Sequence, residues 1–493
     1  MIRCRTLASE LRARGADVRF ICRSHPGNAS KLAEDEGFQV MPLPAPEGEL
    51  MGSGYAAWLG TSQEQDAEQT RKAMDGNRAD WLIVDHYALD ACWEREVRPS
   101  VGGIMAIDDL ANRLHDCDVL LDQSYGADTA RAYETLVPLG CRQLLGPRYA
   151  LLRPEYRQRG PRLRRGIGRV LVFFGGADID NATGLALEAL SAPDLSHLDV
   201  DVVIGPANPH REAVAAQAGR RGRVTLHGPR PHLADLMDAA DLAIGAGGAT
   251  AWERLCMGLP AITISIAENQ VLASLALAED GLIAYAGALN ATTARSLGDA
   301  IRDLLGNEGR FSSMSDRGPS VVDGLGGGRV AELMIPSRRE DLHLRDARAS
   351  DAVLYFGWVN ETEVRKQSLN VEPVSWEAHS GWFSKRIASQ DSYMFVLEAR
   401  HGVPVGQIRF DVAKDGTARL SYLLDPVARG RSWAALLVRM GLQRLNSFGN
   451  FDIYAEVKNS NPPSQAVFEG LGFRHEDVAD QNIRVYRAAS RDF

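Results

Sequence analysis

Short apolar runs alternate with longer stretches of mixed polarity over the first 155 residues. The apolar runs predict strands at 18–22, 81–84, 104–107 and 119–121, and the stretches between them predict helices. Strands that alternate with helices favour a parallel sheet covered on both faces. The chain opens on a helix-like segment that contains Leu7 and Leu11, ahead of the first strand.

The same alternation starts again near residue 156. Apolar runs predict strands at 170–174, 200–204, 224–227 and 242–244, with helices from about 182 and over 232–239. We therefore expect two consecutive Rossmann-like domains, 1–155 and 156–335. Two such domains with a cleft between them make the GT-B architecture, and open α/β sheets bind ligands outside the carboxyl ends of their strands.

The pattern changes after a glycine-rich segment at 324–328 and a polar segment at 336–340. Alternating residues predict antiparallel strands at 395–398, 404–410 and 418–424, followed by a helix at 429–445, a strand at 452–457 and a helix at 464–471. The expected fold class is therefore α/β: a GT-B-like pair of Rossmann-like domains followed by a mixed α/β domain over 341–493.

A glycine-rich turn follows the strand at 242–244. Gly245, Gly247 and Gly248 come directly before a helix that starts at Thr250. Glycines let the backbone approach a ligand closely, and a helix N-terminus offers free N–H groups to phosphate. Glu253, one turn into the helix, suits ribose hydroxyls better than phosphate. The segment predicts a site for a nucleotide diphosphate that carries a sugar; the alternative is an ordinary tight turn between strand and helix.

Composition narrows the class of protein. The chain has 493 residues, 45% hydrophobic and 24% charged, as in globular proteins of several domains. A net charge of −9 gives no reason to expect a nucleic-acid partner. Six scattered cysteines fit a reducing cytoplasm and indicate no metal site. We see no signal peptide, and no apolar run reaches the ~20 residues that span a membrane.

Several separate motifs within residues 1–335 resemble the hydrolase of pseudaminic acid biosynthesis, a relative of the MurG-type glycosyltransferases. The motifs are Trp81–Asp90, Ile107–Arg113, Cys117–Gln123, Leu145–Pro154, Phe173–Asp178 and Gly245–Gln270. The resemblance implies removal of UDP from UDP-2,4-diacetamido-2,4,6-trideoxy-β-L-altropyranose, with no metal.

The resemblance also implies roles for single residues. Glu253 is expected at the uridine ribose. The glycine pairs Gly175–Gly176 and Gly247–Gly248 are expected to form amide clusters for the pyrophosphate. His86 and Tyr87 follow a strand end, where ordinary packing is the alternative to catalysis. We assign catalysis to Asp85, His86 and Tyr87, and substrate binding to Arg3, Gly175, Gly176, Gly247, Gly248, Thr250, Glu253, Asn269 and Gln270.

In this family the general base is a histidine in a Gly-x-Gly-His-x-x-Arg-Cys loop. Arg3 and Cys4 match the end of that loop, and the histidine would precede Met1. We therefore expect a start codon further upstream, and binding by residues 1–335 is better supported than turnover. His25 and His86 are candidate substitutes for the base.

Residues 341–493 resemble a GNAT N-acetyltransferase, which implies acetyl-CoA as a substrate. The family's Arg/Gln-x-x-Gly-x-Gly/Ala loop is matched by Arg429-x-x-Ser432-x-Ala434, with serine in place of a glycine. Phe468 stands where many relatives carry a tyrosine as general acid, which leaves the acid unassigned. The residues assigned to acetyl-CoA are Leu423, Arg429, Gly430, Arg431, Ser432, Trp433, Ala434, Asn461, Ser464 and Phe468.

The acceptor side of this domain is expected at 376–383, where Trp376 and Trp382 either stack on a sugar or base or belong to the core. Glu398 or Glu456 is a candidate to relay a proton from the amine through water.

The resemblances predict a cytoplasmic, bifunctional enzyme that hydrolyses a UDP-sugar and N-acetylates a UDP-linked amino sugar. Two alternatives remain open for the front half: a glycosyltransferase that uses a UDP-sugar, and a non-catalytic module that binds UDP-sugars and is attached to an acetyltransferase.

Overall fold

The computed structural model describes residues 1–46, 54–126, 129–477 and 482–493. The chain divides into two compact units, 1–327 and 328–493, which we call the first and second unit. None of the described helices is long and apolar enough to cross a bilayer.

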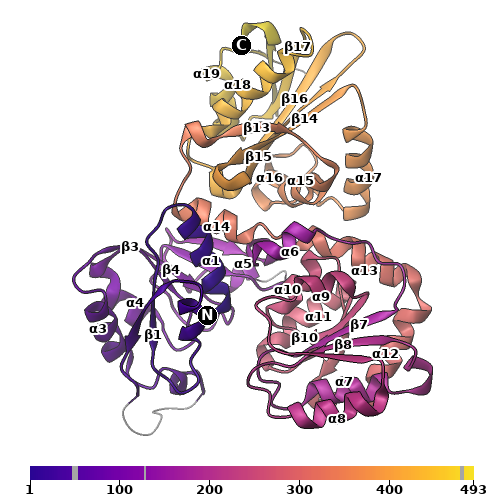
Figure 1. Ribbon diagram of the computed structural model, residues 1–493. Coiled ribbons are helices and arrows are strands. Elements are labelled where there is room, and N and C mark those ends of the chain that lie inside the picture. Colours follow the sequence, from indigo (N-terminus) through magenta and orange to yellow (C-terminus); the bar gives the residue numbers. More distant parts are fainter. Residues whose placement is uncertain (47–53, 127–128, 478–481) are drawn as a thin grey trace. The chain divides into compact units, whose positions relative to one another are not determined.

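The first part of the first unit holds two parallel sheets (Figure 1). One is the pair β1–β2, and the other has the order β3-β4-β5-β6, in parallel throughout, as the sequence predicts. The strands are β1 (Arg19–Arg23), β2 (Gln39–Leu43), β3 (Ala79–Val84), β4 (Val101–Ile107), β5 (Val119–Asp122) and β6 (Arg142–Leu145). The helices are α1 (Ile2–Ala13), α2 (Ser30–Glu34), α3 (Gln63–Ala73), α4 (Ala91–Val97), α5 (Thr129–Ala132) and α6 (Pro154–Arg159).

The second part of the first unit is built on six parallel strands in the order β12-β11-β10-β7-β8-β9. The strands are β7 (Arg169–Phe173), β8 (Asp199–Val203), β9 (Val224–His227), β10 (Leu242–Ala246), β11 (Ala261–Ser265) and β12 (Ala284–Ala288). The helices are α7 (Ala182–Leu190), α8 (Arg211–Arg221), α9 (Ala234–Ala239), α10 (Thr250–Cys256), α11 (Val271–Glu279), α12 (Ala294–Gly306), α13 (Glu308–Val321) and α14 (Gly326–Met334), whose last residues lie in the second unit.

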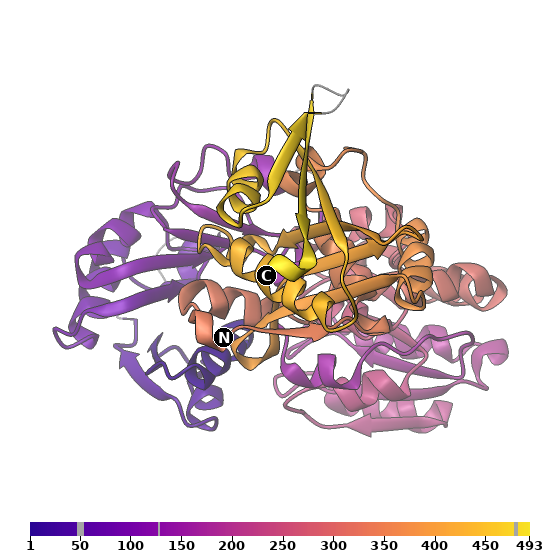
Figure 2. The ribbon, with the colours of Figure 1, turned by 90° about the horizontal axis from the view of Figure 1, so that it is seen from above.

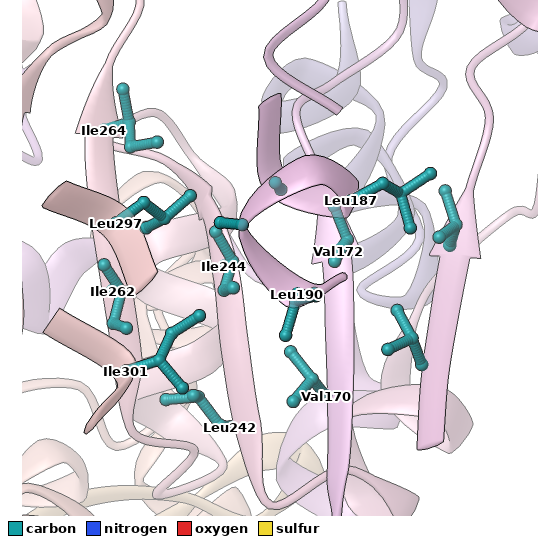
Figure 3. Packing of buried hydrophobic residues seen from close by; sticks show 14 of the residues in the cluster. Val170, Val172, Leu187, Leu190, Leu242, Ile244, Ile262, Ile264, Leu297 and Ile301 are labelled. Atoms are coloured by element: carbon teal, nitrogen blue, oxygen red, sulfur yellow. The ribbon is translucent and has the colours of Figure 1, made fainter. Parts of the chain in front are cut away.

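The core of this sheet explains its nearly continuous apolar sequence. Alternate residues of β7, β10 and β11, such as Val172 and Ile244, point to one face and pack against Leu187 of α7 and Ile301 of α12 (Figure 3). Residues between them, such as Leu171 and Ala243, are buried in a second cluster. A parallel strand covered on both faces has no polar side to show, so apolar residues occupy consecutive positions.

The second unit is a seven-stranded sheet in the order β13-β14-β15-β16-β17-β19-β18. Its strands are β13 (His343–Asp346), β14 (Ser392–Ala399), β15 (Val403–Val412), β16 (Thr417–Leu424), β17 (Asp452–Lys458), β18 (Arg474–Asp477) and β19 (Ile483–Ala489). Its helices are α15 (Ala352–Val359), α16 (Thr362–Gln367), α17 (Trp376–Ile387), α18 (Trp433–Asn446) and α19 (Pro462–Gly470).

This sheet forks between β16 and β17, which pair in parallel. The two strands pair only over 417–419 and 452–454, although β16 continues to Leu424 and β17 to Lys458. Each strand keeps a full ladder on its other side, β16 with β15 and β17 with β19. In Figure 2 the orange and the yellow strands of this sheet run in clearly different directions. We call the gap beyond Arg419 and Tyr454 the sheet fork.

The start of α18 differs from the sequence expectation. The helix expected at 429–445 begins at Trp433, because Gly430 (φ +78°) and Ser432 (φ +57°) have left-handed backbone that a helix cannot continue. The division into 1–155, 156–335 and 341–493 stays a prediction. In α14, Arg329 and Glu332 form ion pairs with Asp425 and Arg431, and all four residues belong to the second unit.

Candidate functional site

Two glycine turns lie at the point where the strand order of the six-stranded sheet reverses. β7 and β10 are neighbours, with Phe173 opposite Gly245, and the chain leaves them in opposite directions across the sheet. Gly175 and Gly176 follow β7, and Gly247 and Gly248 follow the paired part of β10. In open α/β sheets, ligands bind at this switch point, outside the carboxyl ends of the strands.

The local backbone requires glycine at this edge. Gly175 has φ +95°, a conformation that L side chains rarely adopt. A Cβ on Gly245 would lie 2.5 Å from the Phe173 carbonyl oxygen, and a Cβ on Gly205 only 2.2 Å from that of Gly176. Glycine is therefore needed to bring these strand ends together.

Buried and partly buried side chains support the turn after β10. The Arg254 guanidinium donates to the Ala246 carbonyl (2.7 Å) and to the Thr250 hydroxyl (3.4 Å), and burial lowers its pKa to about 10. The Gln270 Oε1 accepts from the Ile266 N–H (3.1 Å), and its Nε2 lies 3.6 Å from the position of a Cβ on Gly248. Gln270 thus lies beside the turn, and its contact with a ligand stays a prediction.

Glu253 and Asn269 occupy different environments. Burial raises the pKa of Glu253 to about 7, although a hydrogen bond from Tyr156 of α6 acts against that shift. Asn269 lies on an exposed 3-10 turn, Glu268–Gln270, that follows β11. The buried partner Tyr156 was not foreseen, because nothing in its local sequence distinguishes it from a core tyrosine.

Asp178 is a further residue that the sequence assignment missed. Its carboxylate accepts hydrogen bonds from the N–H groups of Ala182 (2.8 Å) and Thr183 (3.1 Å) at the start of α7. It therefore fixes the chain that leaves Gly176. The Gly-Gly-x-Asp spacing at 175–178 is the sequence signal that could have identified it.

A second polar group lies at the carboxyl ends of β3 and β4. The Arg3 guanidinium binds Asp85 (Nη2–Oδ1 2.6 Å, Nε–Oδ1 3.1 Å) and Asp109 (Nη1–Oδ2 3.2 Å). Burial alone would raise the pKa of Asp85, but the charge of Arg3 lowers it to about 2. Two predicted residues, Arg3 and Asp85, thus meet through an ion pair, and Asp109 is a third member that was not predicted.

Tyr87 and His86 follow Asp85 with different surroundings. Burial raises the pKa of Tyr87, and a hydrogen bond with Asp109 adds to the shift. The Tyr87 ring packs on Tyr55 (4.8 Å between centroids) and on Trp58, which is 56% exposed. The His86 Nδ1 accepts from the Ala88 N–H (3.1 Å). The proton of a neutral ring is then on Nε2, which leaves His86 no lone pair for a base.

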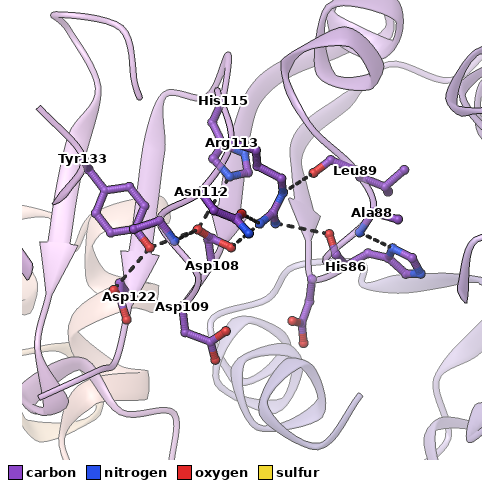
Figure 4. Close-up of polar contacts among 12 residues, drawn as sticks. His86, Ala88, Leu89, Asp108, Asp109, Asn112, Arg113, His115, Asp122 and Tyr133 are labelled. Atoms are coloured by element: carbon purple, nitrogen blue, oxygen red, sulfur yellow. Dashed lines mark hydrogen bonds and ion pairs between the residues drawn. The ribbon is translucent and has the colours of Figure 1, made fainter. Parts of the chain in front are cut away.

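A buried network holds these strand-end loops in place (Figure 4). Arg113 donates to Asp108 (2.7 Å) and to the carbonyls of Leu89 (2.9 Å) and His86 (3.4 Å). Asp108 also accepts from the Tyr133 hydroxyl (3.0 Å), which binds Asp122 as well (3.2 Å).

His115 completes this network. Its Nδ1 lies 2.8 Å from the Glu94 carboxylate. Burial would lower the pKa of His115, but Asp108 and Glu94 raise it to about 9. The ring is therefore charged near neutral pH.

In the second unit, predicted acetyl-CoA residues lie on β16, in the loop before α18, at the start of α18 and on α19. Leu423 lies on β16 beyond the fork, and Ser432 and Ala434 stand at the start of α18. The charged side chains of this loop are engaged elsewhere: Arg429 binds Glu361 (2.6 Å), and Arg431 binds the buried Glu332 (3.1 Å). The side chains of Arg429 and Arg431 are thus paired within the chain.

Three other predicted residues have structural roles. Asn461 accepts from the Ser464 N–H (3.2 Å) and caps α19. The side chains of Trp433 and Phe468 are only 3% and 2% exposed, so contact with a ligand would have to come from their backbone. Ser464, in contrast, has its Oγ 3.0 Å from the hydroxyl oxygen of Tyr422 on β16. Tyr422 was not predicted.

The remaining candidates of this unit are engaged in local contacts. Glu398 binds Arg345 (2.6 Å), and Glu456 binds Arg419 (2.6 Å). Trp376 is buried, and the Arg409 guanidinium lies 4.8 Å from the Trp382 ring. In the parts of the chain that the structure describes, no three His, Cys, Asp or Glu side chains could hold a metal ion.

Comparisons with known proteins match the two parts of the chain separately. Residues 341–474 match the family described as acetyltransferase (GNAT) domain. The N-terminal half is similar to the spore coat polysaccharide biosynthesis protein SpsG of Bacillus subtilis, with 27% identity over 55% of this chain and 80% of that protein. It is also similar to the UDP-2,4-diacetamido-2,4,6-trideoxy-beta-L-altropyranose hydrolase of Campylobacter jejuni, with 26% identity over 51% of this chain and 89% of that enzyme.

One relative spans both parts. An uncharacterized protein of Methanocaldococcus jannaschii, MJ1062, is 22% identical over 98% of this chain and 95% of its own length. The chain is thus a fusion of an N-terminal part homologous to sugar-nucleotide-processing proteins with a C-terminal GNAT acetyltransferase domain.

Proposed function

We propose that the chain is a bifunctional enzyme of pseudaminic acid biosynthesis. The first unit hydrolyses UDP-2,4-diacetamido-2,4,6-trideoxy-β-L-altropyranose to the free sugar and UDP. The second unit transfers an acetyl group from acetyl-CoA to a UDP-linked amino sugar. N-acetylation of the 4-amino group produces the substrate that the first unit then cleaves.

The observation that carries the hydrolase proposal is the pair of glycine turns at the switch point of the six-stranded sheet. Gly175, Gly176, Gly247 and Gly248 present backbone N–H groups at one edge, which suits a pyrophosphate. Gln270 lies beside them. Glu253 has a pKa of about 7, so its carboxyl is partly ionised at neutral pH. It can then accept hydrogen bonds from ribose hydroxyls.

The second polar group supplies the chemistry in this proposal. A water oxygen bonds to the anomeric carbon, the carbon–oxygen bond to UDP breaks, and UDP leaves with the electron pair. Asp109 takes the water's proton in this proposal, because its carboxylate is 23% exposed, forms an ion pair with Arg3 (3.2 Å) and lies next to Tyr87. His86 is less suited, since its Nδ1 already accepts from the backbone.

Release of UDP from this UDP-sugar tests the proposal. Release in water alone supports hydrolysis; release only with a second sugar acceptor indicates a glycosyltransferase; binding without release indicates a binding module. Asp109→Asn should lower kcat by about 100-fold or more. The exposed Asp35→Asn serves as a matched control and should leave kcat unchanged.

The sheet fork supports the acetyltransferase half. It provides a gap between two strands, and the start of the 14-residue helix α18 lies in the loop that resembles the family's acetyl-CoA segment. Release of CoA from acetyl-CoA in the presence of a UDP-linked 4-amino sugar tests this half independently of the first.

A further inference from the structure

Two hydroxyl groups meet across the sheet fork. Tyr422 lies on β16, three residues beyond the last pair that β16 makes with β17, and Ser464 lies in the first turn of α19, which follows β17. The Tyr422 Oη is 3.0 Å from the Ser464 Oγ. β16 and α19 are thus joined at this level by a hydrogen bond between side chains.

Acetyl transfer creates a need for an acid at the fork. The amine nitrogen bonds to the thioester carbonyl carbon, the carbon–sulfur bond breaks, and the sulfur leaves with the electron pair as a thiolate. A positioned acid that protonates this thiolate lowers the barrier. Phe468 has no proton to give, and its ring is buried against Tyr422, Phe473 and Tyr486.

We propose that Tyr422 is the acid that protonates the CoA thiolate, and that Ser464 holds its hydroxyl in place. This inference rests on the proposed acetyltransferase function. After transfer, the Ser464 hydroxyl donates a hydrogen bond to the Tyr422 tyrosinate, and solvent then reprotonates Tyr422. The acetylated nitrogen loses its extra proton to solvent. The products are the N-acetylated sugar and the CoA thiol, and Tyr422 is protonated again.

The surroundings of Tyr422 fit this role. Burial raises the pKa of Tyr422, so the hydroxyl stays protonated at neutral pH, and the side chain is still partly exposed. The Phe468 ring fixes it edge to face at 5.8 Å. Of the other tyrosines described in this unit, Tyr355 donates to the Phe395 carbonyl and Tyr486 donates to Glu469.

The test is steady-state kinetics with acetyl-CoA and a UDP-linked 4-amino sugar, followed as CoA release from pH 6 to 11. Tyr422→Phe should lower kcat about 100-fold with little change in the KM for acetyl-CoA, and should abolish the alkaline limb of the profile. Ser464→Ala should shift that limb to higher pH, because the hydrogen bond from Ser464 lowers the pKa of Tyr422. Tyr393→Phe, on β14 against Phe448, is the matched control with unchanged kcat.

The outcomes separate the inference from the function on which it rests. A wild-type chain that releases no CoA overturns the proposed acetyltransferase. An active wild type whose Tyr422→Phe variant keeps its rate, or loses rate but keeps the alkaline limb, overturns the role of Tyr422 alone. If Tyr422→Phe does not fold, the wild type made with 3-fluorotyrosine decides: the limb must move to lower pH, and a limb that stays in place overturns the inference.

Discussion

The Arg3 guanidinium and the Asp85 carboxylate form a two-pronged ion pair, with Nη2 and Oδ1 2.6 Å apart. Arg3→Met leaves a buried carboxylate without this cation, so the free energy of unfolding measured in urea should fall by about 3 kcal/mol. The double variant Arg3→Met/Asp85→Asn, which removes both charges, should recover part of that loss. Equal losses in the two variants would show that the pair is not coupled.

Glu253 should make UDP binding depend on protons. At pH 6 a carboxyl with a pKa of about 7 is mostly protonated, and hydrogen bonds from ribose hydroxyls favour its ionised form. UDP binding, measured by calorimetry in two buffers of different ionisation enthalpy, should then release close to one proton at pH 6. It should release almost none at pH 8. Glu253→Gln cannot ionise, and the same release in that variant would contradict the role of Glu253.

His115 should make the first unit lose stability in alkali. Its folded pKa of about 9 lies above the ordinary value of 6.5, so its contribution is complete below pH 6.5 and is lost as pH rises through 9. The loss between pH 6 and pH 10 is on the order of 3 kcal/mol. Urea unfolding of wild type and His115→Asn at pH 6, 8 and 10 measures it. Parallel curves for the two proteins would refute the assignment.

Replacing Ser432 with glycine should stabilise the second unit. Its backbone has φ +57°, which costs a residue with a side chain about 1 kcal/mol relative to glycine. Ser432→Gly should therefore raise the unfolding free energy of the second unit by about that amount, seen as a higher Tm. Ser432→Ala keeps the strained backbone and provides the control; an equal gain in both variants would point to the lost hydroxyl instead.

The sequence was sufficient for the fold class and for many of the strands, because periodic apolar residues determine both, but β2, β6, β11, β12, β18 and β19 were not predicted. The strand expected at 224–227 is β9 without a change of boundary. The left-handed backbone at Ser432 was not predictable, since serine at that position carries no signal of its own. Tyr422 and Tyr156 were also missed: each gains its partner only through contacts distant in sequence, with Ser464 and Glu253. Arg429 and Arg431 matched a motif, but their side chains are paired internally.

At the sheet fork, the central strands β16 and β17 stop pairing with each other, so each has one edge like that of a strand at the border of a sheet. Beyond 419 and 454, β16 and β17 each have one edge whose N–H and C=O groups face the gap and not a neighbouring strand. An occupant with amide groups along an extended chain can add to either ladder by main-chain hydrogen bonds. Binding at the fork should therefore slow hydrogen exchange of backbone amides in 420–424 and 455–458, and leave the rest of the sheet as it was.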